Sequence, residues 1–423
     1  KYLKEFLTKN DIDGIIINST NEFLVEYNLL EENSRFYLTD FSGSTGDVLF
    51  TNDKIYLFVD TRYHEQADNQ VNHDYIEVVK MPLSKSYIDS LAETVPPYFK
   101  LGIISKKTSK IFFDNLSKKL QLKNIDIKIF NYDPVDEYRK SSLKAIVYNV
   151  FAVNKESAGM SPDEKFALIK EYAEGNFNIV VTSLEDIAYL TNLRSYDFDY
   201  SAVFPAKAII DNNGVKIFSD CNLPFIGENY KVYPLDDFEK NIKDIKNSEL
   251  FIDKTKLNIY DYRLINQNNK ILPSRLNLFK TVKNENEISH LKSCFERSDK
   301  ALRVINDMIL SETVYSEYDY YQALVNAMKD NGALSLSFKP IVAAGKNTSI
   351  IHYSTPSKEK MVEDGDLLLV DYGGYYEGGL ATDTTRTFIK GTPSVEQKTA
   401  YTSVLKAFLN AYFNKYNKKS SYF

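Results

Sequence analysis

The sequence has little of what stabilises secreted domains or builds thiolate metal sites. Its 423 residues include no tryptophan and only two cysteines, Cys221 and Cys294. These cysteines fall on what we predict to be different domains, which excludes a disulfide framework and a cysteine-based zinc site. The cysteine content therefore predicts a protein of a reducing compartment, and we expect a cytoplasmic one.

Long apolar segments and an excess of positive charge are also missing. No apolar run approaches the roughly 20 residues that cross a bilayer. Residues 1–5 predict an amphipathic helix and not a secretion signal. The formal net charge is −6, and the lysines are scattered along the chain. We therefore expect no membrane and no nucleic acid among the partners.

What the chain does contain is the composition of a globular protein. Hydrophobic residues make up 43% of the sequence and charged residues 26%. A chain of this length and composition can form two or three domains, each burying its own core.

One pattern of helices and strands occurs twice, about 160 residues apart, which indicates a duplicated α/β domain. The alternative is two unrelated α/β domains with similar hairpins. In the second copy, Ser161 and Glu164 predict a capping box around Pro162 that starts a helix. The predicted strands are 14–17, 48–50 and 55–59 in the first copy and 179–182, 208–210 and 215–218 in the second.

From Glu285 onward the pattern becomes helical. Residues 311–328 predict a second helix, and we expect both helices to cover the outer face of a following sheet. His290 lies beside the first helix's apolar face, and we interpret it, like His64 and His73, as structural. The apolar positions near the helical period are Ile288, Leu291, Phe295, Leu302, Ile305 and Ile309.

A later stretch carries two carboxylates in a pattern that suits a metal site. Leu367–Val370 is a short apolar run, a glycine cluster follows, and Thr382–Phe388 is rich in β-branched residues, which predicts a β-hairpin. Closure of this hairpin brings Asp371 and Asp383 together. Paired buried carboxylates repel unless a cation lies between them, and hard oxygen ligands favour Mn, Mg or Ca. The alternative is that Asp371 caps a turn and Asp383 begins an exposed strand.

Many short motifs follow one another in a single order. They are Arg35–Gly46, Val59–Tyr63, Ala158-Gly159, Ile187–Arg194, Asp197–Phe204, Ser337-Phe338, Gly345–Asn347, Ile350–Tyr353, Asp371 and Thr382–Thr387. In this order they resemble the Xaa-Pro aminopeptidases (aminopeptidase P), metallopeptidases of the pita-bread fold, and above all their long three-domain form. The resemblance covers essentially the whole chain. It implies a mixed α/β protein with two duplicated creatinase-like domains, 1–135 and 136–275, and a pita-bread catalytic domain, 276–423.

The resemblance also implies roles for individual residues. Asp371 and Asp383 are expected to bridge two divalent ions, most often Mn, with Zn or Co as alternatives. His352 is expected beside the metals as a catalytic residue that hydrogen-bonds the substrate and stabilises charge on the scissile peptide. A buried histidine held by the neighbouring backbone is the other interpretation of His352. Thr385 and Arg386 are candidates to orient a ligand carboxylate.

Three further residues are candidates for substrate binding. Phe338 resembles an aromatic residue that lines the family's pocket, although a core position explains it equally well. Arg62 and Tyr63 lie in the first domain, where the family's pocket meets the catalytic domain, and a packed pair with Asp60 also explains Arg62. The implied substrate is a peptide with proline second, which needs a dedicated pocket because proline lacks an N–H and restricts the preceding residue. A homodimer is expected for the full-length protein.

Two departures from the family pattern lead to further expectations. Eleven residues separate Asp371 from Asp383, one more than is usual in the family, so we expect an extra turn residue or a bulge. The family's other metal ligands, a histidine and two glutamates, are not found in 390–423, and we expect them beyond the point where this chain stops. The catalytic domain would then be incomplete, and the chain alone would bind metal weakly and lack peptidase activity.

Three functions therefore compete. The first is an aminopeptidase that releases the N-terminal residue from peptides with proline second. The second is a proline dipeptidase or creatinase-like hydrolase, which the three-domain layout disfavours. The third is a non-catalytic pita-bread module that binds peptides or proteins, and the presence of His352, Asp371 and Asp383 argues against it.

Overall fold

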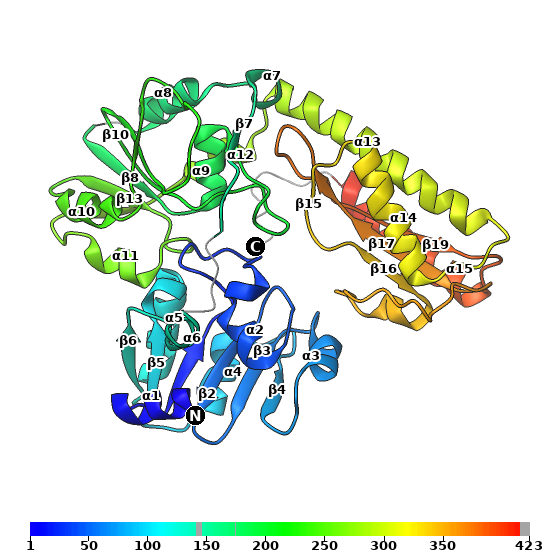
Figure 1. The fold of residues 1–423 in the computed structure, drawn as a ribbon, viewed down its shortest axis with the longest axis horizontal. Coiled ribbons are helices and arrows are strands. Elements are labelled where there is room, and N and C mark those ends of the chain that lie inside the picture. The colour runs from blue at the N-terminus through cyan, green and yellow to red at the C-terminus, as the bar shows by residue number, and fades with distance from the viewer. Residues whose placement is uncertain (141–145, 174, 415–423) are drawn as a thin grey trace.

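The protein consists of three lobes, each built on its own sheet (Figure 1). The computed structural model describes residues 1–140, 146–173 and 175–414. We call residues 1–139 the first lobe, 151–281 the second lobe and 285–413 the third lobe. Each sheet packs against helices of its own lobe in a buried core, and Phe23 and Val25 of the first lobe extend into the core of the second.

The first lobe has a six-stranded sheet in the order β4-β3-β2-β1-β5-β6. Strand β1 is apolar and buried along its whole length because helices cover both faces of the sheet. In β1, Ile15 and Ile17 enter one core and Ile16 enters the other. The strands are β1 (Gly14–Ile17), β2 (Asp47–Thr51), β3 (Ile55–Val59), β4 (Ile76–Lys80), β5 (Lys100–Ile104) and β6 (Asp126–Phe130). The helices are α1 (Tyr2–Asn10), α2 (Ser34–Thr39), α3 (His64–Gln70), α4 (Tyr87–Thr94), α5 (Lys110–Gln121) and α6 (Pro134–Arg139).

The second lobe repeats this topology, which confirms the predicted duplication. Its sheet order is β12-β11-β10-β8-β13-β14, the first lobe's order when the strands are counted along the chain. The strands are β8 (Phe177–Val181), β10 (Lys207–Asp211), β11 (Gly214–Phe218), β12 (Tyr230–Tyr233), β13 (Glu249–Ile252) and β14 (Lys270–Pro273), and a short pair is formed by β7 (Phe151–Ala152) and β9 (Leu193–Arg194). The helices are α7 (Lys155–Ala158), α8 (Pro162–Tyr172), α9 (Leu184–Thr191), α10 (Asp237–Asp244), α11 (Ile259–Leu264) and α12 (Leu276–Thr281). The predicted capping box at Ser161 and Glu164 starts α8.

The third lobe has two helices on one face of a three-stranded antiparallel sheet, in the order β16-β17-β19. Buried residues of the two helices share one core with β16 and β17, as predicted. The elements are α13 (Glu285–Leu310), α14 (Glu317–Asp330), β15 (Ser335–Leu336), β16 (Ile341–Ala344), β17 (Leu367–Tyr372), β18 (Gly374–Tyr375), β19 (Thr384–Ile389) and α15 (Val395–Phe413).

The structure corrects two details of the predicted helices. Helix α13 exists, but in its first half Ile288 and Phe295 are exposed, whereas Cys294 and Ser298 are buried. Small side chains face inward there because the segment after β17 approaches closely: Ser298 Oγ lies 3.4 Å from a threonine hydroxyl of that segment. The second helix, α14, begins after Ser316 and not at residue 311, because Ser316 provides its capping box.

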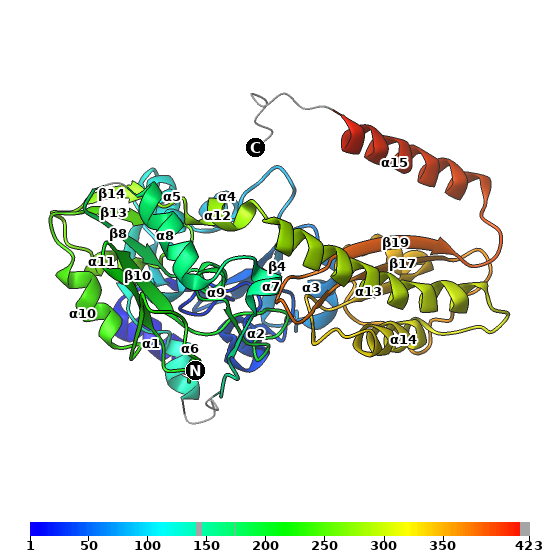
Figure 2. The same ribbon diagram turned by 90° about the horizontal axis from the view of Figure 1, so that it is seen from above.

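Helix α15 extends away from the other elements (Figure 2). None of its residues is buried. Residues 415–423 lie outside the described part of the chain. The prediction that 390–423 contains no further metal ligands can therefore be compared with the structure only as far as residue 414. In the described residues, no helix is long and apolar enough to cross a membrane.

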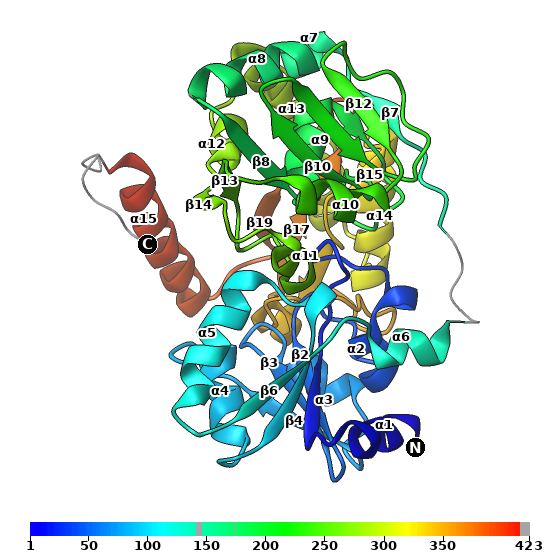
Figure 3. The same ribbon diagram turned by 90° about the vertical axis from the view of Figure 1, so that its left-hand side faces the viewer.

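The lobes are joined by specific polar contacts. Tyr196 of the second lobe donates from its hydroxyl to the carbonyl of Tyr376 in the third lobe, at 2.7 Å. Asn258 of the second lobe donates from Nδ2 to the carbonyl of Glu22 in the first, at 2.9 Å. Seen from the side, the first and second lobes lie one below the other, with β17 and β19 behind their junction (Figure 3).

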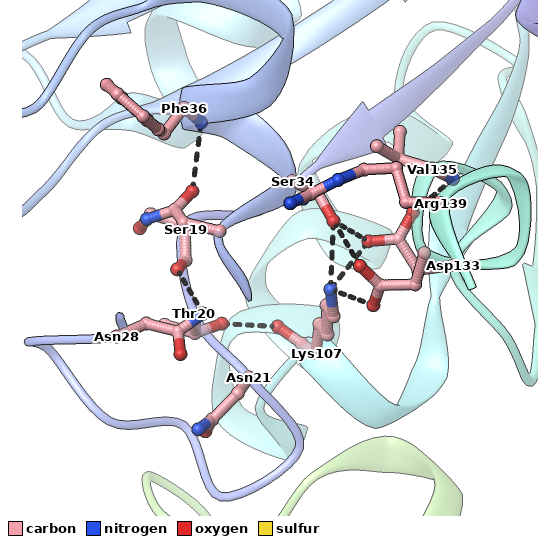
Figure 4. A network of polar contacts seen from close by, with 12 residues as sticks. Ser19, Thr20, Asn21, Asn28, Ser34, Phe36, Lys107, Asp133, Val135 and Arg139 are labelled. Carbon is pink, nitrogen blue, oxygen red and sulfur yellow. Dashed lines mark hydrogen bonds and ion pairs between the residues drawn. The ribbon is translucent and has the colours of Figure 1, made fainter. Parts of the chain in front are cut away.

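A buried cation holds the first lobe's final helix in place (Figure 4). Lys107 Nζ lies 2.7 Å from Asp133 Oδ2, 2.6 Å from Asp136 Oδ2 and 3.1 Å from Ser34 Oγ. The side chains of Lys107 and Asp133 are 8% and 2% exposed. The ion pair therefore ties α6 and the start of α2 to the end of β5, and removal of one partner would leave a buried charge without compensation.

We expect Lys107→Met to destabilise the first lobe by about 3–5 kcal/mol, because Asp133 keeps its charge but loses its cation. Native-state hydrogen exchange with mass spectrometry measures this as a fall in the opening free energy of peptides from β5 and α6. The control is Lys54→Met, which breaks an ion pair with Glu77 whose side chains are 56% and 48% exposed. Protection in the control should not change. Equal effects in the two variants would contradict this interpretation.

Candidate functional site

Strand pairing places the two predicted ligand aspartates on one face of the third sheet. Asp371 is the penultimate residue of β17 and pairs with Thr385 of β19. Val370 and Tyr372 are buried against α13 and α14, so the alternation along the strand turns Asp371 to the other face. If the register is continued by one pair, Asp383 lies opposite Gly373, diagonal to Asp371 on the same face.

The predicted hairpin is confirmed as an antiparallel ladder, and its register has no bulge. The six pairs from Leu367 with Ile389 to Tyr372 with Thr384 are continuous. Ten of the eleven residues between the aspartates, 373–382, therefore lie in the connection between the strands, where β18 pairs with β15. We expected either an extra turn residue or a bulge between Asp371 and Asp383. The structure has the longer turn and no bulge in the ladder.

The environment of Asp371 favours a nearby cation. Burial raises the pKa of the Asp371 carboxyl above its ordinary value, the hydrogen bond from Thr385 lowers it, and the charge of Asp383 raises it again. Thr385 Oγ1 donates to Asp371 Oδ1 at 2.7 Å. Among the described residues, no cation contributes to the pKa shift of Asp371, and a divalent cation would supply positive charge beside the two carboxylates.

Both aspartates open into a cavity of about 370 Å³ that all three lobes line. The first lobe contributes a wall that includes Glu26, Ser44 and Tyr63. The second lobe contributes Asp199 and Tyr200. The third lobe contributes Phe338, Lys339, Ile341, His352, Ser354, Asp371 and Asp383. The cavity therefore brings together carboxylates, a histidine and an aromatic side chain that lie far apart in the sequence.

His352 lies in this cavity, in the connection between β16 and β17, and contacts the first lobe. Its Nδ1 is 2.7 Å from Tyr63 Oη. Burial lowers the pKa of the imidazole, the nearby Arg62 lowers it further, and Asp60 partly opposes the shift. His352 is therefore neutral at neutral pH and can take part in hydrogen bonding and proton transfer.

A buried glutamate that the sequence did not reveal holds the segment that carries His352. Glu317, at the start of α14, is fully buried. Its Oε1 accepts hydrogen bonds from Ala344 N at 2.7 Å and Asn347 Nδ2 at 2.9 Å. Its Oε2 accepts from Tyr353 Oη at 2.7 Å and Ser357 N at 3.0 Å. Four donors from both sides of His352 thus converge on one carboxylate, which fixes the path of the segment.

The other predicted site residues are placed as follows. Phe338 and Tyr63 line the cavity. Arg62 is not among the residues that line it, and its Nη2 pairs with Asp60 Oδ2 at 2.7 Å. Arg386 is exposed, donates to the carbonyl of Thr385 and makes no hydrogen bond to either aspartate.

A buried arginine shapes the first-lobe wall of the cavity. Arg35 is fully buried, and its Nη1 donates to the carbonyl of Thr45 at 3.1 Å while its Nη2 donates to that of Gly43. These bonds fix the turn that carries Ser44, another cavity residue that sequence reasoning missed. The signal was present in the motif Arg35–Gly46, but the motif does not tell which residue faces the cavity.

The carboxylates fit a divalent metal as part of a ligand set. Among the described residues, no group of three or more His, Cys, Asp or Glu side chains is arranged to hold a metal ion. Asp371 and Asp383 provide hard oxygen donors, of the kind that Mn and Mg prefer. The two aspartates therefore suit one side of a metal centre, and the described residues supply no third ligand.

We expect Glu317→Gln to loosen the segment that carries His352 by about 1–3 kcal/mol, because the new amide group faces Tyr353 Oη and Ser357 N–H, both of which donate to the carboxylate. Hydrogen exchange of peptides covering 344–357 measures the effect. Glu359→Gln is the control, because the Glu359 side chain accepts from the Ser357 hydroxyl in an exposed position. Unchanged exchange in Glu317→Gln would contradict the anchoring role.

Three family models match the chain in succession. The creatinase/prolidase N-terminal domain matches residues 1–136, a second domain of that description matches 144–287, and metallopeptidase family M24 matches 289–414. Among curated proteins, the probable Xaa-Pro aminopeptidase P of Coprinopsis cinerea is 27% identical over 96% of this chain and 71% of its own length. Xaa-Pro aminopeptidase 1 of Dictyostelium discoideum is 27% identical over 96% of this chain and 69% of its own length.

A solved structure has the same fold. It is the X-prolyl aminopeptidase of Caenorhabditis elegans, described as a cytosolic enzyme with a di-nuclear active site, and it aligns with a TM-score of 0.85 at 21% identity. The alignment covers 94% of this chain and 69% of that one. The chain therefore carries a domain of metallopeptidase family M24 at residues 289–414, preceded by two creatinase/prolidase N-terminal domains at 1–136 and 144–287.

Proposed function

We propose that the protein is a metal-dependent aminopeptidase that releases the N-terminal residue from peptides with proline in the second position. The observation that supports this most is the single cavity that joins Asp371 and Asp383 to His352 under a wall from the first lobe. The similarity to proteins named Xaa-Pro aminopeptidase supports the choice of substrate.

The proposed metal centre lies at the paired carboxylates. Asp371 and Asp383 would hold two divalent ions together with further ligands, and hard oxygen donors favour Mn, with Zn and Co as alternatives. Bound there, such ions supply a Lewis acid for the scissile carbonyl and for the attacking water. Thr385 keeps Asp371 oriented through its hydrogen bond at 2.7 Å.

The other cavity residues bind and position the peptide. His352 forms a hydrogen bond with the substrate beside the carboxylates and takes part in proton transfer or charge stabilisation. Phe338 offers an apolar surface for a proline ring, and Glu26 of the first lobe and Asp199 of the second add negative charge to the cavity wall. That charge suits the free α-ammonium group of a peptide, so the proposed cavity selects chain ends. The large share of the wall contributed by the first lobe also shields the reaction from bulk water.

The proposal predicts cleavage of a peptide such as Arg-Pro-Pro by the protein at its full natural length, with loss of activity on chelation and recovery on addition of Mn. Asp371→Asn should lower metal content and activity together, because it removes one of the two carboxylates that would hold the ions. Asp307→Asn, an exposed change on α13, serves as the control and should retain both. The assay follows released arginine, with metal content measured in parallel. Activity that survives exhaustive chelation would refute the proposal.

His352→Ala should lower kcat by about 10²-fold or more while metal content stays unchanged, as expected for a residue that acts on the substrate and does not bind metal. The matched control is His73→Ala, since His73 is exposed in the first lobe and its ring forms a hydrogen bond with the carbonyl of Asp68, away from the cavity. Steady-state kinetics and metal analysis are made on the same preparations. Loss of metal from His352→Ala would instead identify His352 as a ligand.

A further inference from the structure

One hydrogen bond crosses the cavity from the first lobe to the third. It joins Tyr63 Oη and His352 Nδ1 at 2.7 Å, and the two rings meet edge to face, with centroids 4.9 Å apart and planes at 89°. Tyr63 is only 2% exposed and also packs edge to face on Phe41. The tyrosine ring is therefore fixed by its own lobe, and the histidine meets a partner whose position is already set.

The tyrosine hydroxyl belongs to a short chain of hydrogen bonds. Tyr63 Oη lies 2.8 Å from Ser44 Oγ, and Ser44 Oγ donates to Glu26 Oε1 at 3.1 Å. The backbone N–H of Ser44 also donates to Tyr63 Oη, at 3.3 Å. The series of hydrogen bonds therefore runs from His352 through the hydroxyl groups of Tyr63 and Ser44 to the carboxylate of Glu26.

The number of protons available in this series of hydrogen bonds fixes which atom donates in each bond. An ionised carboxylate only accepts, so the single hydroxyl proton of Ser44 goes to Glu26. The proton of Tyr63 then goes to Ser44 Oγ, and Tyr63 Oη is left as the acceptor for His352. His352 must carry its proton on Nδ1. The reverse direction would leave the contact between Ser44 and Glu26 without a proton.

The protonation states of the two rings agree with this count. Burial raises the pKa of Tyr63, so its hydroxyl keeps its proton near neutral pH. Burial lowers the pKa of His352, so its ring carries a single proton there. No hydrogen-bond partner for Nε2 is found among the described residues, and His352 lines the cavity.

We propose that Tyr63 is a positioning residue that holds neutral His352 in the Nδ1–H tautomer and leaves Nε2 as a hydrogen-bond acceptor in the cavity. His352 then receives a hydrogen bond from a donor there, such as a water molecule or an N–H group of the peptide. It can donate from Nε2 only after it has taken up a proton. The assignment of the tautomer rests on the geometry of the hydrogen bonds and the protonation states of the groups that they join, and its effect on turnover rests on the proposed function.

Nitrogen-15 NMR of histidine-labelled, metal-free protein tests the tautomer directly. The chain has only four histidines, and His352→Gln assigns the signal of His352. Long-range proton–nitrogen correlations distinguish a protonated Nδ1 from a protonated Nε2. Slightly above neutral pH, the wild-type protein should show His352 with Nδ1 protonated and Nε2 bare.

Two variants separate the chain of hydrogen bonds from a simple contact. Tyr63→Phe removes the acceptor and should shift His352 toward the Nε2–H form. Ser44→Ala keeps the contact between Tyr63 and His352 but frees the tyrosine proton to point at Nδ1, so it should shift the tautomer in the same direction. Tyr27→Phe changes a tyrosine of the same cavity that has no hydrogen bond to His352, and it should leave the tautomer as it is. The unchanged signals of the other histidines confirm that each variant is folded.

The proposal is overturned if wild-type His352 is in the Nε2–H form, or if Tyr63→Phe and Ser44→Ala leave its tautomer unchanged. In the active enzyme, Tyr63→Phe should lower kcat by about 10-fold to 100-fold, because a histidine in the wrong tautomer loses part of its contribution to proton transfer. KM should change by less. If the protein cleaves no Xaa-Pro peptide, the proposed function fails, whereas the NMR result still decides the tautomer.

Discussion

The interaction on which the rest of the site depends is the hydrogen bond between Tyr63 and His352, because it joins lobes that fold around separate cores. On the first-lobe side, buried Arg35 holds the turn that brings Ser44 to Tyr63. On the third-lobe side, buried Glu317 fixes the segment that carries His352. On both sides, buried charged groups anchor the segments next to the contact, which restricts their displacement.

This arrangement explains how a small cavity combines two kinds of chemistry. The third sheet turns Asp371 and Asp383 to one face, where a cation or a proton relieves their repulsion. The first and second lobes close that face and add polar groups that suit a peptide end. Fixed polar groups inside a partly closed cavity act more strongly than they would in water, which is the usual basis of enzymatic charge stabilisation. The metal side and the substrate side therefore come from different lobes.

The sequence predicts what depends on neighbours in the chain and misses what depends on distant ones. The duplicated strands, the capping box at Ser161 and the ladder that carries Asp371 follow from local patterns, and the structure confirms them. Glu317 gave no signal, because its donors lie 27 to 40 residues away, and the contact between Tyr63 and His352 spans 289 residues. The prediction of the buried face of α13 was wrong for the first half of the helix. Small side chains, which carry little hydrophobic signal, face inward there.

The central claim is that a metal held by Asp371 and Asp383 lies next to a wall supplied by the first lobe. Paramagnetic broadening by Mn tests it most directly, in the protein at its full natural length labelled with ring carbon-13 in tyrosine and nitrogen-15 in histidine. Our account predicts that one added Mn broadens the signals of both His352 and Tyr63, the latter assigned through Tyr63→Phe, and leaves His73 sharp. Broadening of His352 with a sharp Tyr63 signal would show that the first lobe does not form part of the site.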